Sequence, residues 1–163
     1  MMIEEFKRKM KEDFEMTDLG LMRYFLGLQV KQTEEEIFIN QEKYCDDLLK
    51  RFNMKNRNPV ATLALLNEKL STNDGAPKVD ASSYRSLVGS LIYLTNTRPD
   101  ILYVVSIVSR FMSNPSKLHY GAAKRILRYL QGKKSMGIKY TTEEDNALSD
   151  YTDVWFESCY FYC

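Results

Sequence analysis

The chain has 163 residues and a formal net charge of +1, a length that suits one medium domain or two small subdomains. Its 44% hydrophobic content excludes a disordered chain. Three cysteines and one histidine show neither metal-ligand spacing nor a disulfide framework. No apolar run approaches the ~20 residues that cross a bilayer. We therefore expect a reduced, soluble, intracellular chain that binds no membrane.

The first forty residues predict a helix and then a hairpin. Apolar residues recur every three or four positions among charged ones, which predicts an amphipathic helix over residues 3–16. These apolar residues are Ile3, Phe6, Met10 and Phe14. Residues 22–31 have the aromatic and aliphatic content of a strand, and residues 37–39 start a second strand after an acidic turn at 34–36. A β-hairpin is therefore expected after the first helix.

A second helix is predicted from Asn40 or Gln41, because Tyr44, Leu48 and Phe52 recur every four residues and share one stripe. Residues 56–80 contain Asn-Pro, Asn-Asp-Gly and Ala-Pro, which are typical of loops. This stretch is the best candidate for a boundary within the chain.

Three further helices are predicted after the linker. Asp80 is a good N-cap for the first, Pro99 suits the first turn of the next, and Ser116 caps a third that ends at Gly132. The apolar stripe of the third helix is expected to comprise Leu118, Ala122, Ile126 and Leu130. A strand is expected over residues 138–141. The predicted fold class is α+β, a mixed first part followed by a small helical bundle.

Tyr44-Cys45-Asp46-Asp47 spells a Tyr-x-Asp-Asp motif, in which paired carboxylates can hold two metal ions for nucleotidyl transfer. That chemistry needs both carboxylates on a tight hairpin facing an open cleft, whereas here they lie within a helical pattern. Asp46 and Asp47 precede Lys50 and Arg51 by four residues, the spacing of surface ion pairs on a helix. We therefore interpret the motif as part of a surface helix, and predict neither catalytic residues nor metal ligands.

Several other segments, spread over nearly the whole chain, resemble the reverse transcriptase of copia-type LTR retrotransposon polyproteins. They are Phe14-Glu15-Met16-Thr17-Asp18-Leu19-Gly20, Tyr24-Phe25-Leu26-Gly27, Ser86-Leu87-Val88-Gly89-Ser90-Leu91, Thr97-Arg98-Pro99-Asp100-Ile101 and Ala123-Lys124-Arg125-Ile126-Leu127-Arg128-Tyr129-Leu130. No single segment is specific, but together they identify the family.

The resemblance implies a division into four segments. Residues 1–55 would be the C-terminal part of the palm, 56–80 a linker, 81–135 the thumb or connection bundle, and 136–163 the truncated start of a ribonuclease H-like domain. Asp153 takes the place of that domain's first metal-binding carboxylate, but the residues after it depart from the family's pattern. The chain would begin after the family's own Tyr-x-Asp-Asp hairpin. It would therefore lack both catalytic centres and the Mg²⁺ that serves the intact parent enzyme.

The resemblance places Tyr24, Phe25, Leu26 and Gly27 where reverse transcriptases position the primer terminus. Gly27 would allow the backbone to approach nucleic acid closely. The alternative is an ordinary strand with a glycine bulge.

On the helix over residues 82–95, Arg85, Gly89 and Tyr93 are spaced four apart and share one face. In the resembling enzymes the equivalent thumb helix lies along the minor groove of the template–primer duplex. A cation, a position without a side chain and an aromatic ring suit phosphates and sugars. The alternative is that Gly89 marks a close contact between helices.

From Ile101 to Thr142 the chain has eight Lys or Arg residues and no Asp or Glu. This asymmetry favours a surface that faces phosphates, although a solvated helix face that binds nothing would have the same composition. On the third helix of the bundle, the predicted nucleic-acid-binding residues are Lys117, Lys124, Arg125 and Arg128.

Three hypotheses follow. The first is a retrotransposon remnant that is inactive alone and contributes a grip on an RNA–DNA or DNA duplex to polyprotein domains that are missing here. The second is a retained, non-catalytic nucleic-acid-binding module. The third is an enzyme that uses Asp46 and Asp47 as metal ligands. The sequence favours the first, with no cofactor of its own.

Overall fold

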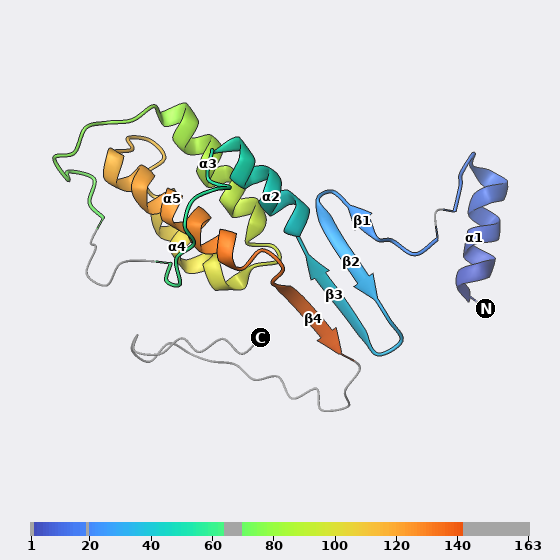
Figure 1. Cartoon of the computed structure of the whole chain (residues 1–163). Helices are drawn as coiled ribbons and strands as arrows, with labels where there is room; N and C mark the ends of the chain where they lie inside the picture. Colours follow the sequence, from blue (N-terminus) through green and yellow to red (C-terminus); the bar gives the residue numbers. More distant parts are fainter. Residues whose placement is uncertain (1, 19, 64–69, 142–163) are drawn as a thin grey trace, which may run out of the picture.

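A computed structural model describes residues 2–18, 20–63 and 70–141. Asp153 and the aromatic residues near the C-terminus therefore lie outside the described residues. The elements are α1 (Met2–Asp13), β1 (Tyr24–Phe25), β2 (Leu28–Gln32), β3 (Glu36–Asn40), α2 (Glu42–Arg51), α3 (Ala81–Leu94), α4 (Pro99–Ser109), α5 (Lys117–Gly132) and β4 (Gly137–Thr141). Figure 1 shows a bundle of α2 to α5, a sheet that extends from it, and α1 apart from both. The fold class is α+β, as predicted.

The three helices of the second part begin where their capping residues predict. The Asp80 carboxylate accepts hydrogen bonds from the backbone N–H groups of Ser82 and Ser83 and caps α3. Pro99 is the first residue of α4. These two residues confirm the predicted starts of α3 and α4. No helix in the described part of the chain combines the length and the apolar composition needed to cross a bilayer.

One hydrophobic core joins α2, α3, α4 and α5. Leu49 of α2, Leu87 and Leu91 of α3, Ile101 of α4 and Ile126 of α5 are all fully buried in it. Because α2 belongs to the predicted 1–55 segment and the other helices to the 81–135 segment, residues from both sides of the predicted linker share this core. The four-segment division stays a prediction.

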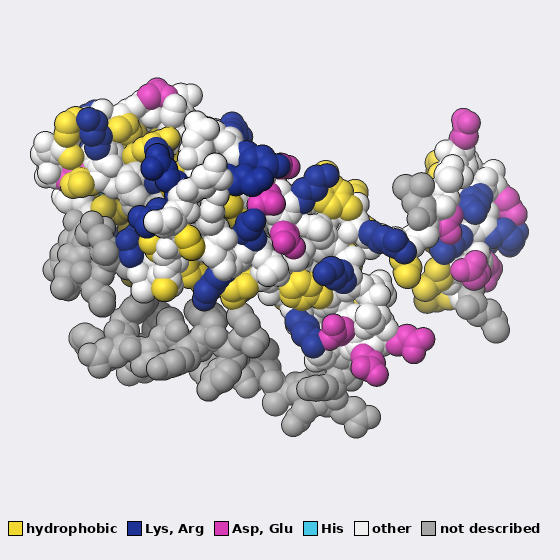
Figure 2. Space-filling view, viewed as in Figure 1, with side chains coloured by type: hydrophobic (Ala, Val, Ile, Leu, Met, Phe, Trp, Pro, Cys, Tyr) yellow, Lys and Arg dark blue, Asp and Glu magenta, His cyan; other side chains and the backbone are white. Residues whose placement is uncertain are grey.

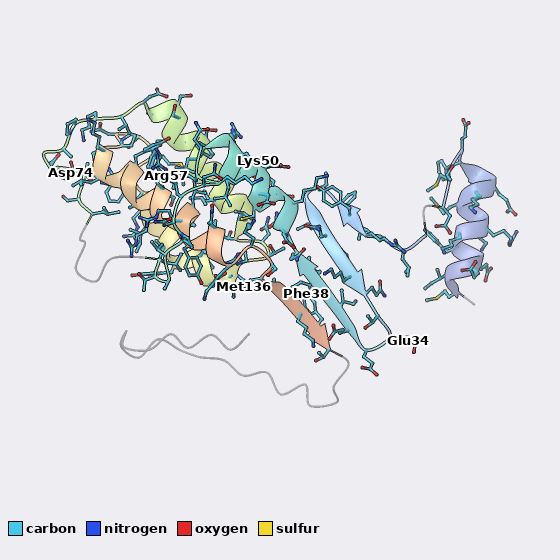
Figure 3. All side chains as sticks on the ribbon, in the orientation of Figure 1. Glu34, Phe38, Lys50, Arg57, Asp74 and Met136 are labelled. Carbon is cyan, nitrogen blue, oxygen red and sulfur yellow. The ribbon has the colours of Figure 1, made fainter. Side chains whose placement is uncertain are left out.

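The start of α5 differs from the predicted register. Leu118, expected on the apolar stripe, is 52% exposed, whereas His119 beside it is fully buried. Ser116 caps α5 as predicted, and the Ser116 N–H donates to Nδ1 of His119 over 3.0 Å. The Ser116 hydroxyl also contacts Asp74, which lies in the loop before α3, so the cap joins that loop to the start of α5. Figure 3 shows Asp74 at that end of the bundle. The prediction for Leu118 was wrong because the buried stripe of α5 begins one residue later and runs through His119, Ala123, Ile126, Leu127 and Leu130.

The four strands form one antiparallel sheet in the order β1-β2-β3-β4. β2 and β3 form the predicted hairpin, and β4 adds at the edge of β3. The single strand expected over residues 22–31 is wrong, because Leu26 and Gly27 have φ of 48° and 83° and turn the chain between β1 and β2. Two consecutive left-handed residues are typical of a type I′ hairpin turn.

A buried ion pair joins the end of α5 to the start of α4. Arg98 is 3% exposed, and its Nε and one terminal nitrogen donate to the Asp100 carboxylate over 2.9 and 2.7 Å. Its other terminal nitrogen donates to the Lys133 carbonyl over 2.7 Å. The Tyr129 hydroxyl donates to the same carboxylate over 3.0 Å. The Thr-Arg-Pro-Asp motif therefore has a structural role at this junction.

Candidate nucleic-acid interface

The turn between β1 and β2 is held against α3. The hydroxyl of Tyr93 donates a hydrogen bond to the Leu26 carbonyl. A Cβ on Gly27 would meet the Tyr93 ring at 3.5 Å, an ordinary van der Waals contact, so glycine is favoured here by its positive φ of 83° and not by lack of space. Tyr44 of α2 packs edge-on against Tyr93 with ring centroids 5.0 Å apart. Side chains of α2 and α3 therefore hold the turn in position.

The side chains at this turn are exposed. Leu26 is 71% exposed at its tip, and Tyr24 and Phe25 are about half exposed. Leu26 keeps a left-handed backbone that a bulky residue rarely adopts. The structure therefore shows a short strand at Tyr24 and Phe25 and a hairpin turn at Leu26 and Gly27, instead of a glycine bulge within one strand.

Arg85 and Gly89 lie on the exposed face of α3, while Tyr93 is half-buried between the turn and α2. The Arg85 guanidinium donates only one long hydrogen bond, of 3.4 Å, to the Met112 carbonyl. A Cβ built on Gly89 would meet no atom within 4 Å apart from its chain neighbours and the backbone of its own helix. Gly89 therefore makes no close contact with another described helix, and that alternative is wrong for the described residues.

The basic residues of α5 line a hollow of about 780 Å³ between α5 and the segment after α2. Its wall contains all four residues of α5 that were predicted to bind nucleic acid: Lys117, Lys124, Arg125 and Arg128. The structure adds Arg51 and Arg57 from the opposite side. Sequence reasoning missed these two because they lie outside the acid-free stretch 101–142. Figure 2 shows Lys and Arg side chains spread over the bundle, and Figure 3 labels Arg57 there.

None of these six cations forms an ion pair with a described carboxylate. Instead, Arg51 donates to the Ser86 hydroxyl, Arg125 to the Thr62 hydroxyl and Arg128 to the Asn58 carbonyl. Lys124 lies over the ring of Tyr120, with its Nζ 4.8 Å from the centroid. The described residues that line the hollow include no Asp or Glu. The hollow therefore has a strongly positive potential.

Asp46 and Asp47 lie in α2, as the surface-helix interpretation predicts. Asp46 pairs with Lys134 over 2.8 Å, and Asp47 with Lys50 over 3.0 Å. The hydrogen bond from Lys134 holds the pKa of Asp46 below its usual value. Neither predicted pair at a spacing of four forms, because Lys50 pairs with the aspartate three residues before it and Arg51 donates to Ser86 of α3. Within the described ranges, no three His, Cys, Asp or Glu side chains gather as metal ligands would.

The amino-acid sequence of the chain is similar to that of several transposon proteins. A family model described as reverse transcriptase (RNA-dependent DNA polymerase) matches residues 1–65. The Retrovirus-related Pol polyprotein from transposon RE1 of Arabidopsis thaliana is 40% identical over 145 residues, which cover 89% of this chain and 10% of that polyprotein. The corresponding polyprotein from transposon TNT 1-94 of Nicotiana tabacum is 38% identical over 162 residues, covering 94% of this chain and 12% of the relative.

A third relative is shorter. The putative transposon Ty5-1 protein of Saccharomyces cerevisiae is 33% identical over 154 residues, and the match covers 93% of this chain and 50% of that protein. The chain thus spans about a tenth of the two plant polyproteins and half of the yeast protein. No solved structure matches significantly.

Proposed function

From the premise that this chain belongs to the reverse transcriptase region of copia-type retrotransposon polyproteins, we propose that it grips a template–primer duplex and supplies no polymerase catalysis of its own. In this proposal the sheet and α2 correspond to the end of the palm, and α3 to α5 to the thumb. The duplex would be an RNA–DNA hybrid or DNA.

The contact between Tyr93 and the Leu26–Gly27 turn supports this proposal best. The turn and α3 were each expected to contact nucleic acid, and they lie 67 positions apart in the sequence. The Tyr93 hydrogen bond joins them into one surface that presents Leu26, Arg85 and Gly89 to solvent. Such a surface offers an apolar tip for a primer end, a cation for a phosphate and an open backbone position for the sugar edge.

The absence of catalysis rests on the two adjacent carboxylates. Asp46 and Asp47 project from one helix and are engaged by Lys134 and Lys50, respectively. A two-metal site needs carboxylates that converge on ions about 3.5–4 Å apart. We therefore expect no primer extension by this chain with added Mg²⁺. Extension that is abolished by Asp46→Asn/Asp47→Asn would overturn this part of the proposal.

Binding to a fluorescent RNA–DNA hybrid, followed by anisotropy over a salt series, tests the grip. Arg85→Ala is expected to weaken binding and to lower the salt slope by about one. Gly89→Leu is more telling, because space is open there and leucine favours a helix by nearly 1 kcal/mol over glycine. It should therefore raise stability while it blocks approach of the duplex.

Arg8→Ala in α1 removes the same charge from an exposed helix away from this surface and is the matched control. Its hybrid binding should stay within about twofold of the unmodified chain, in keeping with the small effect of one distant, screened charge. If Gly89→Leu binds the hybrid as well as the unmodified chain does, the duplex does not lie along α3.

A further inference from the structure

We infer that the basic hollow between α5 and the segment after α2 is a second nucleic-acid site, which takes the backbone of a single strand. This inference goes beyond a grip on the duplex through α3. Elsewhere in the described chain many cations already pair with carboxylates, as Lys50 and Lys134 do. The six cations of the hollow have no carboxylate partner among the described residues, so no described ion pair weakens their attraction for an anion.

The size and walls of the hollow favour a single strand. A volume of about 780 Å³ corresponds to a space roughly 9 Å on a side, which is narrower than a duplex, because the major groove of a duplex alone is ~12 Å wide. Lys117 and Lys124 come from α5, whereas Arg51 and Arg57 come from the segment on the other side. A strand between these walls would be contacted from two sides, whereas a duplex would only touch the rim.

The uncharged lining supports the same ligand. Tyr120 and Phe52 are half-buried in the wall, and Asn53 and Asn58 add amide groups. Aromatic rings among cations are the combination that proteins use for single-stranded nucleic acid, because every base has a face that can stack. The carboxylates of an acidic peptide would be matched by the cations alone, without the aromatic rings.

The six cations differ in how firmly internal contacts hold them. Arg125 and Arg128 are held by hydrogen bonds to Thr62 and to the Asn58 backbone, so they also support the wall. The side chains of Arg57 and Lys117 donate to no partner in the described ranges. These two are therefore the positions at which the charge can be removed without loss of an internal contact.

The test compares binding of a labelled oligothymidylate and of the RNA–DNA hybrid to the full chain. Arg57→Ala/Lys117→Ala should lower affinity for the single strand at least about tenfold at about 100 mM salt and reduce its salt slope by about 1.4, from two lost phosphate contacts. Hybrid binding should change less than about twofold, whereas Arg85→Ala should do the reverse. Lys9→Ala/Lys11→Ala in α1 is the control with the same change of charge.

Each outcome decides between the two sites. If the oligothymidylate does not bind, or the hollow variant binds it normally, the inference is wrong while the duplex surface can still stand. If the hollow variant loses both ligands equally, there is one shared surface and not two. If polyglutamate displaces the single strand as well as an unlabelled oligothymidylate does, the hollow is a general polyanion site, and the inference fails.

Discussion

Removal of the Arg98 side chain is expected to destabilise the bundle strongly. Arg98→Ala leaves the Asp100 carboxylate buried without its ion-pair partner and frees the Lys133 carbonyl at the end of α5. Breaking one side of a buried pair costs about 3–5 kcal/mol. For a chain of this size, that corresponds to a fall in melting temperature of roughly 6–20 °C.

The stability that the Arg98–Asp100 pair contributes depends on pH. Burial pushes the pKa of Asp100 upward, but the hydrogen bond and charge of Arg98 outweigh it, so the pKa lies below its ordinary value. In the unmodified chain this carboxylate therefore adds stability above about pH 3.9, and the contribution is lost as the pH falls through the folded-state pKa. In Arg98→Ala the upward effect of burial on the pKa of Asp100 is opposed by the hydrogen bonds from Tyr129 and from the Asp100 backbone. Because burial is the largest of these three influences, we expect the pKa to rise above its unfolded value.

Urea unfolding followed by circular dichroism at several pH values measures both effects. The stability difference between Arg98→Ala and the unmodified chain should be largest near about pH 7 and shrink toward about pH 5, as the stranded carboxyl takes up a proton. Arg110→Ala, at the other end of α4, removes an exposed arginine and should cost under about 0.5 kcal/mol. A loss below about 1 kcal/mol for Arg98→Ala, or a difference that does not shrink at low pH, would refute the reasoning.

Three other substitutions report on separate parts of the fold. Burial raises the pKa of the Cys45 thiol to about 11. In a chain whose other two thiols are removed by Cys159→Ser/Cys163→Ser, a thiol reagent near pH 8 should therefore modify Cys45 only on unfolding; fast labelling of the folded chain would contradict this. Leu26→Asn suits the left-handed backbone and should raise the unfolding free energy by about 1 kcal/mol in urea, whereas any loss would count against strain at the turn. Ser116→Ala removes the cap of α5 and should cost about 1 kcal/mol by the same measurement, with Ser113→Ala nearly neutral as the control; equal effects would deny the cap its role.

The helices were predictable because their ends depend on local chemistry. Asp80 caps α3 with its own carboxylate, and Pro99 is accepted at a first turn, where its missing N–H costs nothing. Such signals act over three or four residues and survive in any tertiary setting. The strand break at Leu26 had no such signal, because leucine rarely takes a positive φ and only the contact with the distant Tyr93 explains its position.

The candidate site was predictable in part for the same reason. An acid-free stretch pointed to Lys117 and Lys124, and a spacing of four pointed to Arg85 and Gly89. What the sequence could not indicate is which distant segments meet. Arg57 follows α2 in a polar loop without pattern, and only the packing of that loop along α5 makes it part of the hollow.

The core explains why the two candidate surfaces can coexist in one chain. Its buried residues come from α2 through α5, whereas the apolar residues of β2, β3 and β4 neither belong to it nor pack against it in the described structure. The turn is held to this core through Tyr93 alone among the described hydrogen bonds, and the hollow is built on α5 and the end of α2. The bundle therefore carries both surfaces. Within its core, α2 joins the part of the chain that the reverse transcriptase model matches, residues 1–65, to the three helices that lie beyond it.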